Sequence, residues 1–163
     1  MTIKIGDKIP SAILMEMRDG KPTPVKTDDF FAGRTVVLFA LPGAFTPTCS
    51  AKHVPGFVTN HGALTAKGVD AIACLSVNDA FVMGAWGKDQ GAGDKVHMLA
   101  DGNGDFTRAV GLEMDGTAFG MGKRSQRYSM VIKDGVVKSL NVEQAGAFEV
   151  SSAEYLLTSG QLA

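Results

Sequence analysis

The residues best able to do chemistry lie between Pro42 and Cys49. This stretch reads Pro-Gly-Ala-Phe-Thr-Pro-Thr-Cys and directly follows an apolar, β-branched run at 35–41. That run predicts a buried strand, and a helix is predicted to begin at Thr48 or Cys49. Free N–H groups and the helix dipole in a first helical turn favour an anion, and the thiolate is the nucleophilic form of cysteine. The alternative is a buried cysteine that acts only as a small apolar side chain.

The overall composition argues against several classes of protein. The chain has 163 residues, 16 basic and 17 acidic, and a formal charge of −1, which argues against a nucleic-acid partner. Its two cysteines, Cys49 and Cys74, are too few for a disulfide scaffold or a cysteine-only zinc site. No run reaches the roughly 18 apolar residues of a membrane span. A signal peptide is also missing, so we expect a cytoplasmic protein without a membrane partner. An organelle is the alternative if a targeting peptide has been removed.

Periodicity and turn residues predict the elements that position the cysteine. The predicted strands are 35–41, 69–77, 96–100, 127–133 and 136–142, the last two joined as a hairpin by Asp134-Gly135. The predicted helices are 48–68 with a kink or break at Pro55, 80–88 after a cap at 78–79, 106–112, and 151–158 after a capping box at 151–154. Residues 1–34 predict short strands and turns. This order predicts a single α/β domain, 1–163, with a central mixed sheet and helices on both faces.

The stretch around Cys49 resembles the peroxiredoxins. Pro42-x-x-x-Thr46-x-x-Cys49 is similar to their active-site pattern, and the run from Pro42 to Phe57 is similar to the type II branch, the peroxiredoxin-5 subfamily. Further similar segments lie, in order, at 67–70, 75–86, 99–102, 124–128 and 148–153. The resemblance covers most of the chain. It implies a thioredoxin-like fold with an N-terminal strand extension.

The resemblance also implies roles for individual side chains. Cys49 would be the peroxidatic cysteine, which attacks the peroxide and becomes a sulfenic acid. Thr46 would bind the peroxide oxygens and donate to the thiolate, and Pro42 would shield the pocket. Arg127 would stabilise the thiolate and the charge on the leaving oxygen. No cofactor and no metal are implied.

Arg127 has a neighbour that could compete for the same role. Strand alternation places Arg127 on one sheet face with Ser129 and Val131, which favours it for the site. Arg124 and Lys123 could instead pair with surface carboxylates, the commoner fate of an arginine, and a supporting place for Arg124 behind Arg127 is the alternative. His53 lies one helical turn after Cys49 and could modulate the thiolate, although a structural hydrogen bond is the favoured alternative. The other histidines, at 61 and 97, stand apart from any ligand cluster.

Apolar residues near the site predict a pocket and an interface. We expect Gly43, Phe45 and His53 to border the substrate pocket, with Phe119, from the loop 116–122, as an apolar wall. The family resemblance implies a homodimer. Four side chains are candidates for its interface, with ordinary core packing as the alternative for each: Phe45, Phe81, Met83 and Trp86.

The second cysteine, Cys74, has two alternative roles. Cys74 lies within a predicted buried strand, and an inert core thiol is favoured over a resolving cysteine. A disulfide with Cys49 needs Cα atoms within roughly 7 Å, so the helix start would have to unwind. At the position that holds a resolving cysteine elsewhere in the family, this chain has Ser151. We therefore expect glutathione or a glutaredoxin to reduce the sulfenic acid.

The sequence suggests three functional hypotheses. The leading hypothesis is a thiol peroxidase for hydrogen peroxide and small alkyl hydroperoxides. The alternative is a redox-sensing or chaperone-like interaction protein on the same fold. A dithiol oxidoreductase is excluded, because no Cys-x-x-Cys pair is present.

Overall fold

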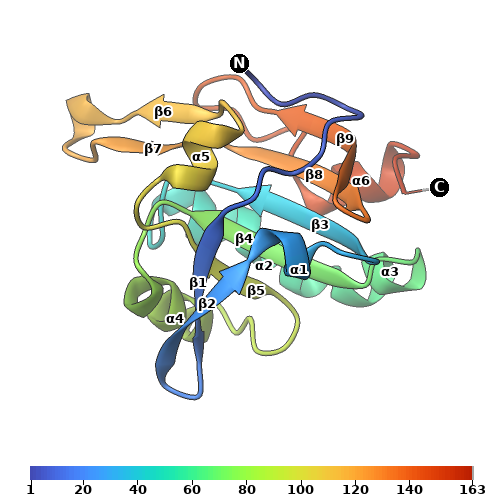
Figure 1. The fold of residues 1–163 in the computed structure, drawn as a ribbon, viewed down its shortest axis with the longest axis horizontal. Helices are drawn as coiled ribbons and strands as arrows, with labels where there is room; N and C mark the ends of the chain where they lie inside the picture. The colour runs from blue at the N-terminus through green and yellow to red at the C-terminus, as the bar shows by residue number, and fades with distance from the viewer. Residues whose placement is uncertain (163) are drawn as a thin grey trace.

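The computed structural model describes residues 1–162 and has a seven-stranded mixed sheet at its centre (Figure 1). The strand order is β2-β1-β5-β4-β3-β8-β9. The strands are β1 (Ile13–Arg18), β2 (Lys21–Lys26), β3 (Thr35–Ala40), β4 (Ala71–Ser76), β5 (His97–Ala100), β8 (Tyr128–Lys133) and β9 (Val136–Val142). β3, β4 and β5 run parallel, and β8 and β9 continue the sheet antiparallel beside β3. The expected thioredoxin-like fold with an N-terminal strand extension, the β1–β2 hairpin, is confirmed.

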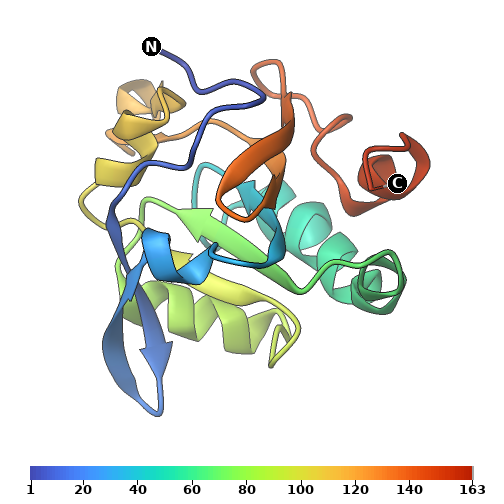
Figure 2. The same ribbon diagram turned by 45° about the vertical axis from the view of Figure 1, so that its right-hand side comes forward.

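Helices cover both faces of this sheet (Figure 2). One face carries α2 (Val54–Thr59), α3 (His61–Ala66), α4 (Ala80–Asp89) and α6 (Ala153–Thr158), and the other carries α1 (Thr27–Phe30) and α5 (Asp105–Ala109). The side chains of β3 divide accordingly. Val37 and Phe39 pack on the first face, while Val36 and Leu38 pack on the second. This is why the run is apolar at every position from Val36 to Leu41 instead of alternating.

The segment after Cys49 differs from the single kinked helix that the sequence predicts. A π-helical turn, η1 (Cys49–His53), leads into α2, and α2 and α3 are separated at Asn60. Pro55 lies in the first turn of α2, a position that proline tolerates, directly after the π-helical turn. The break falls instead at Asn60, whose side-chain amide donates to Gly56 O at 2.8 Å.

Two further expectations about element ends need correction. The cap of α6 is Ser152, whose hydroxyl accepts from the Tyr155 N–H, because the Ser151 hydroxyl is engaged by Glu143. The predicted cap of α4 at 78–79 is confirmed: it is Asp79, which accepts from the Val82 N–H at 2.8 Å. Arg127 lies one residue before β8, although Val131 does share the core of the Cys49 face, as alternation requires.

A small hairpin that the sequence did not predict extends from the domain. Strands β6 (Glu113–Asp115) and β7 (Lys123–Ser125) pair antiparallel and are joined through the 3-10 turn η2 (Thr117–Phe119). Figure 1 shows the hairpin projecting to one side of the main sheet. No helix within residues 1–162 is long and apolar enough to cross a membrane.

Candidate active site

Cys49 lies at the carboxyl end of β3, where the loop 41–48 turns into η1. Asn78 holds this loop from the neighbouring strand end, since its side-chain oxygen accepts from the Ala44 N–H at 3.0 Å and from the Ser76 hydroxyl at 2.6 Å. Phe45 adopts a positive φ of 62°, which turns the chain sharply before Cys49. The Cys49 side chain is fully buried. A π-helical turn is rare and often marks a functional position.

The guanidinium of Arg127 contacts the sulfur of Cys49. Its Nη2 donates to Cys49 Sγ at 3.1 Å, and its Nη1 donates to His53 Nδ1 at 2.8 Å. The antiparallel pairing of β8 with β3 brings the two segments together, because Tyr128 pairs with Ala40. A fixed cation with an N–H aimed at the sulfur stabilises a thiolate there.

His53 is neutral and has a defined tautomer. Arginine only donates hydrogen bonds, so Nδ1 of His53 must accept, and Nε2 carries the proton and donates to Ser151 O at 3.0 Å. Burial and the positive charge of Arg127 lower the pKa of His53 to about 3. The ring also packs against Phe39 and Phe148, with centroids 4.8 and 5.0 Å away. His53 therefore acts as an acceptor that orients Arg127.

Thr46 is placed differently from the expectation in one respect. Its hydroxyl donates to Gly43 O at 2.7 Å, so its proton is not available to the thiolate in this conformation. The lone pairs of the hydroxyl remain as acceptors for a peroxide O–H. Arg124 supports the same loop, because its Nη1 donates to Pro42 O at 3.4 Å and its Nε donates to Met121 O at 2.9 Å.

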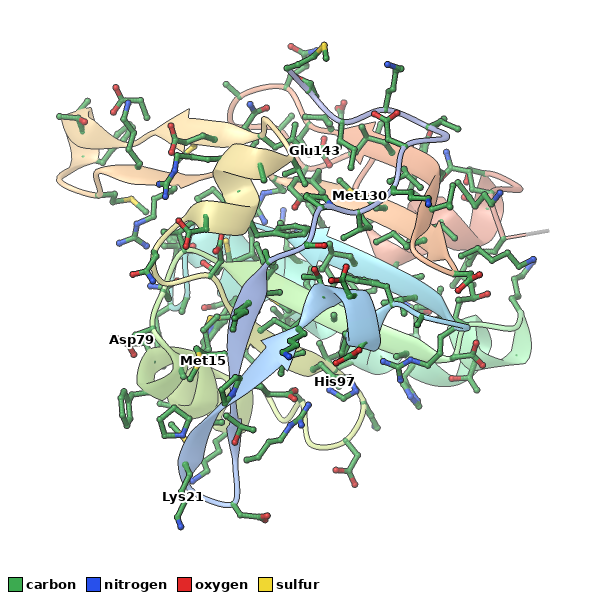
Figure 3. The ribbon with its side chains drawn as sticks, in the orientation of Figure 1. Met15, Lys21, Asp79, His97, Met130 and Glu143 are labelled. Atoms are coloured by element: carbon green, nitrogen blue, oxygen red, sulfur yellow. The ribbon has the colours of Figure 1, made fainter. Side chains whose placement is uncertain are left out.

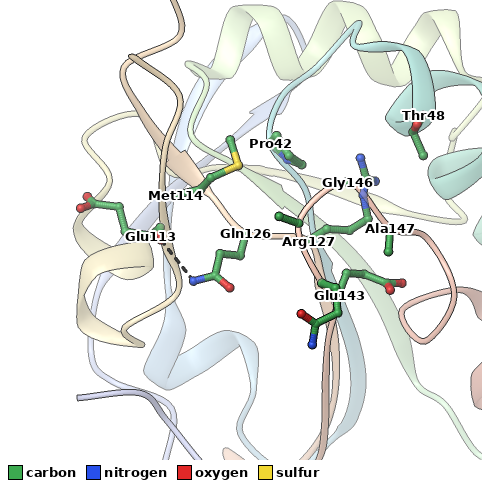
Figure 4. Close-up of a pocket in the computed structure, with 11 residues that line it drawn as sticks. Pro42, Thr48, Glu113, Met114, Gln126, Arg127, Glu143, Gly146 and Ala147 are labelled. Atoms are coloured by element: carbon green, nitrogen blue, oxygen red, sulfur yellow. Dashed lines mark hydrogen bonds between the residues drawn. The ribbon is translucent and has the colours of Figure 1, made fainter. Parts of the chain in front are cut away.

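A cavity of about 270 Å³ opens beside Arg127 (Figure 4). Its lining includes Pro42, Thr48, Met114, Gln126, Glu143 and the loop 144–147. Of the predicted site residues, Pro42 and Arg127 line it, whereas six others do not: Cys49, Thr46, Gly43, Phe45, His53 and Phe119. Phe119 is 82% exposed on the projecting hairpin, Phe45 is 55% exposed, His53 is buried under Arg127, and Gly43 packs against the Arg124 side chain.

The sequence missed several residues of this cavity. Met114 takes the place expected for Phe119 as an apolar wall, because β6 rather than the hairpin tip lies against the site. Glu143 follows β9 directly, and its position just after a strand end is the only signal in the sequence that could have drawn attention to it. Two proposed interface residues, Met83 and Trp86, are fully buried core, and the Trp86 indole N–H donates to Ser50 Oγ at 3.0 Å.

The two cysteines are both unbridged. Cys74 lies in β4, between Phe39 of β3 and Met98 of β5, and is fully buried. Burial and the nearby charge of Cys49 raise the pKa of the Cys74 thiol well above its usual range. Residues 1–162 hold no group of three or more acidic, histidine or cysteine side chains that could bind a metal ion.

Comparison with known proteins decides the family. Residues 4–157 match the family described as Redoxin. A rice protein (Oryza sativa subsp. japonica), Peroxiredoxin-2E-2, chloroplastic, is 56% identical over 161 residues, which cover 96% of this chain and 72% of that protein. The chain belongs to the peroxiredoxin family. Peroxiredoxins are thiol peroxidases, so its activity is the reduction of peroxides by a thiol.

Other relatives show the same match over their whole length. Peroxiredoxin-2B of Arabidopsis thaliana is 45% identical, with 95% of this chain and 96% of that protein covered. The crystal structure of reduced Prx3 from Vibrio vulnificus in complex with hydrogen peroxide superposes with a TM-score of 0.93 at 51% identity. That superposition covers 97% of this chain and 99% of the other.

Proposed function

We propose that Cys49 is the peroxide-reducing thiol and that its substrates are hydrogen peroxide and small alkyl hydroperoxides. The observation that carries this proposal is the 3.1 Å contact from Arg127 Nη2 to Cys49 Sγ. Cys74 has no comparable donor and a raised pKa. Only the thiolate is nucleophilic, so the arginine-bound sulfur is the one suited to the reaction.

The reaction at Cys49 transfers one oxygen atom. The thiolate attacks the terminal peroxide oxygen, the S–O bond forms, and the O–O bond breaks. The other oxygen leaves as water or alcohol after it takes up a proton, and Cys49 becomes a sulfenic acid. Arg127 stabilises both the thiolate and the charge that develops on the leaving oxygen. Thr46, whose hydroxyl already donates to Gly43 O, accepts the peroxide O–H, and Pro42 excludes water.

The cavity beside Arg127 suits a small, uncharged group. Pro42, Met114 and Ala147 offer apolar contacts, and the polar side chains of the lining include Arg127, Gln126 and Glu143. A volume of about 270 Å³ accommodates a short alkyl tail. A neutral peroxide needs no long-range electrostatic steering, in keeping with a net charge of −1.

Glutathione or a glutaredoxin is the proposed reductant. The only other thiol, Cys74, is buried with a raised pKa, and Ser151 has a hydroxyl that cannot form a disulfide. A glutathione thiolate attacks the Cys49 sulfenic acid, water leaves, and a mixed disulfide forms. A second thiol then releases Cys49 and carries away the disulfide. Because Cys49 is 0% exposed, η1 must open for the first of these attacks.

A homodimer through the face that bears Phe45 and Phe81 completes the proposal. These two aromatic side chains are 55% and 65% exposed, unlike Met83 and Trp86 behind them. Substituting both by serine is expected to give a monomer in analytical ultracentrifugation. A dimer that persists unchanged would place the interface elsewhere. The cytoplasm stays the predicted location, which imaging of a tagged chain in its native cell tests.

Competition kinetics test the peroxidase proposal. One equivalent of hydrogen peroxide is mixed with the reduced protein and an equal concentration of a small-molecule thiol. Cys49 is expected to consume the peroxide, with a change in Trp86 fluorescence, before the free thiol reacts. Thiol loss at Cys49 no faster than in the free thiol would contradict the proposal and favour a redox-sensing role.

A further inference from the structure

Glu143 is a buried carboxylate that lines the cavity beside Arg127, and the reaction steps above do not use it. We propose that Glu143 is a positioning residue for Arg127, acting through Ser151 and His53. The proposal rests on Cys49 being the peroxide-reducing thiol. It adds that the placing of the arginine depends on a carboxylate whose hydrogen bonds go to residues 149–151 and not to the sulfur.

One oxygen of Glu143 collects four hydrogen bonds. Oε2 accepts from the backbone N–H groups of Glu149, Val150 and Ser151 at 2.8, 2.9 and 2.8 Å, and from the Ser151 hydroxyl at 2.7 Å. The Glu143 residue is only 8% exposed. Figure 3 shows it at the end of β9, far from Lys21 at the tip of the β1–β2 hairpin. Four donors converging on a buried carboxylate oxygen fix the backbone at 149–151, because charge-assisted hydrogen bonds are the strong ones.

The fixed backbone continues to the catalytic arginine. Ser151 O accepts from His53 Nε2 at 3.0 Å, and His53 Nδ1 accepts from Arg127 Nη1 at 2.8 Å. A second link runs through the main chain, since the Glu143 N–H donates to Arg127 O at 3.0 Å. Glu143 is thus tied to both the backbone and, indirectly, the guanidinium of Arg127.

Hydrogen bonds, not a direct ion pair, carry the effect. The salt bridges found within residues 1–162 do not include Glu143 or Arg127. His53 can orient the guanidinium only if its Nε2–H has an acceptor, because otherwise the ring is free to turn and the other tautomer competes. Ser151 O is that acceptor, and its position depends on Glu143. Displacement of a catalytic group by as little as 1 Å can cost about 10²-fold in rate.

The test compares Glu143→Ala with Asn141→Ala. Asn141 lies two residues earlier on the same face of β9, is similarly buried, and bonds to Gln161 and Ser129 instead of the Ser151 segment. For each variant, kcat/KM for hydrogen peroxide and the thiolate ultraviolet titration are measured, the latter against the same protein with Cys49→Ser. We expect Glu143→Ala to lower kcat/KM by about 10²-fold and to move the thiolate titration to higher pH. Asn141→Ala is expected to lower the melting temperature only.

A double-mutant cycle separates positioning from general stability. In a His53→Ala background the side-chain path from Glu143 to Arg127 is already cut, and Glu143→Gln leaves the main-chain link intact in both proteins. Glu143→Gln should therefore shift the titration in the parent protein and not in the His53→Ala protein. This comparison decides the matter even if Glu143→Ala does not fold. An unshifted titration in the parent background, or equal shifts in both, would overturn the proposal. The titration needs no peroxide, so its outcome is independent of whether the wild-type protein turns over peroxide.

Discussion

Cys49 and Cys74 occupy the same apolar core and are equally buried, yet their surroundings differ in one respect. Both are 0% exposed and pack on the same face of the sheet. Cys49 receives an N–H from a guanidinium, whereas Cys74 sits in mid-strand among aliphatic and aromatic neighbours. Burial raises the pKa of a thiol, and at Cys74 burial together with the nearby Cys49 raises the pKa well above its usual range. On the proposed assignment, the Arg127 guanidinium is what distinguishes a reactive buried cysteine from an inert one.

The largest difference in peroxidase activity is expected when each cysteine is substituted in turn. Cys49→Ser should lose peroxidase activity by at least about 10³-fold, because no other thiolate is available. Cys74→Ala should keep activity within about twofold and lower the free energy of unfolding by about 1 kcal/mol, since it removes a small buried group. A coupled assay with glutathione and glutaredoxin measures both. Loss of turnover in Cys74→Ala, with sulfenic acid still formed at Cys49, would make Cys74 a resolving residue.

Removing the cation should make Cys49 resemble Cys74. Arg127→Gln is expected to lower kcat/KM by about 10²- to 10³-fold, the range for loss of one transition-state donor, and to shift the thiolate titration upward. Arg127→Lys should recover only part of this, because an ammonium lacks the fork that contacts sulfur and imidazole together. Full activity in Arg127→Gln would show that the guanidinium contact does not account for a difference in reactivity between Cys49 and Cys74.

The neutral His53, beside Arg127 and Cys49, makes the free energy of unfolding depend on pH in the acid range. With a pKa of about 3 in the folded chain, against an ordinary value of 6.5, His53 binds a proton only after unfolding in the window between those values. The free energy of unfolding therefore falls as the pH is lowered, by about 2 kcal/mol between about pH 7 and pH 5.

The matched variant for this prediction is His53→Gln. A glutamine can accept from Arg127 and donate to Ser151 O without titrating. Urea unfolding across that pH range should show the acid-dependent loss in the wild type and a smaller one in His53→Gln. Parallel curves for the two proteins would mean that His53 is protonated in the folded state.

The smallest expected effect concerns Ser50, the direct neighbour of Cys49. Ser50→Ala leaves the buried Trp86 indole N–H without its acceptor, which should cost about 1–2 kcal/mol of unfolding free energy. Peroxidase activity should stay within about twofold, because the Ser50 hydroxyl bonds to Trp86 and not to Arg127. Urea unfolding followed by Trp86 fluorescence, with initial rates as the control, checks both. A large loss of activity would show that η1 as a whole, rather than its arginine contact, sets reactivity.

Local pattern predicted the elements that depend on nearest neighbours. The buried run at 35–41 and the hairpin at Asp134-Gly135 appear as β3, β8 and β9, because strand burial and turn chemistry are written in adjacent residues. The break in the helix after Cys49 was misplaced at Pro55. Proline fits a first helical turn, and the sequence does not reveal that α2 would begin only at Val54.

Contacts between distant segments were harder to predict. The 3.1 Å approach of Arg127 to Cys49 spans 78 residues, and only the family resemblance pointed to that pair. Phe119 was expected as the pocket wall because it is the aromatic residue of its loop, but the hairpin carries it outward and Met114 lies there instead. Glu143 went unnoticed because its partners, residues 149–151, are recognisable only once the loop after β9 has folded back.

The most direct test of Cys49 as the reacting thiol is to locate the oxidised sulfur after a single turnover. The reduced protein is mixed with one equivalent of hydrogen peroxide, the sulfenic acid is trapped with a selective carbon nucleophile, and the labelled peptide is identified by mass spectrometry. The label is expected on Cys49 alone, with Cys74 recovered as a free thiol. A label on Cys74, or labels on both cysteines in similar amounts, would contradict the assignment of Cys49 as the peroxide-reducing thiol.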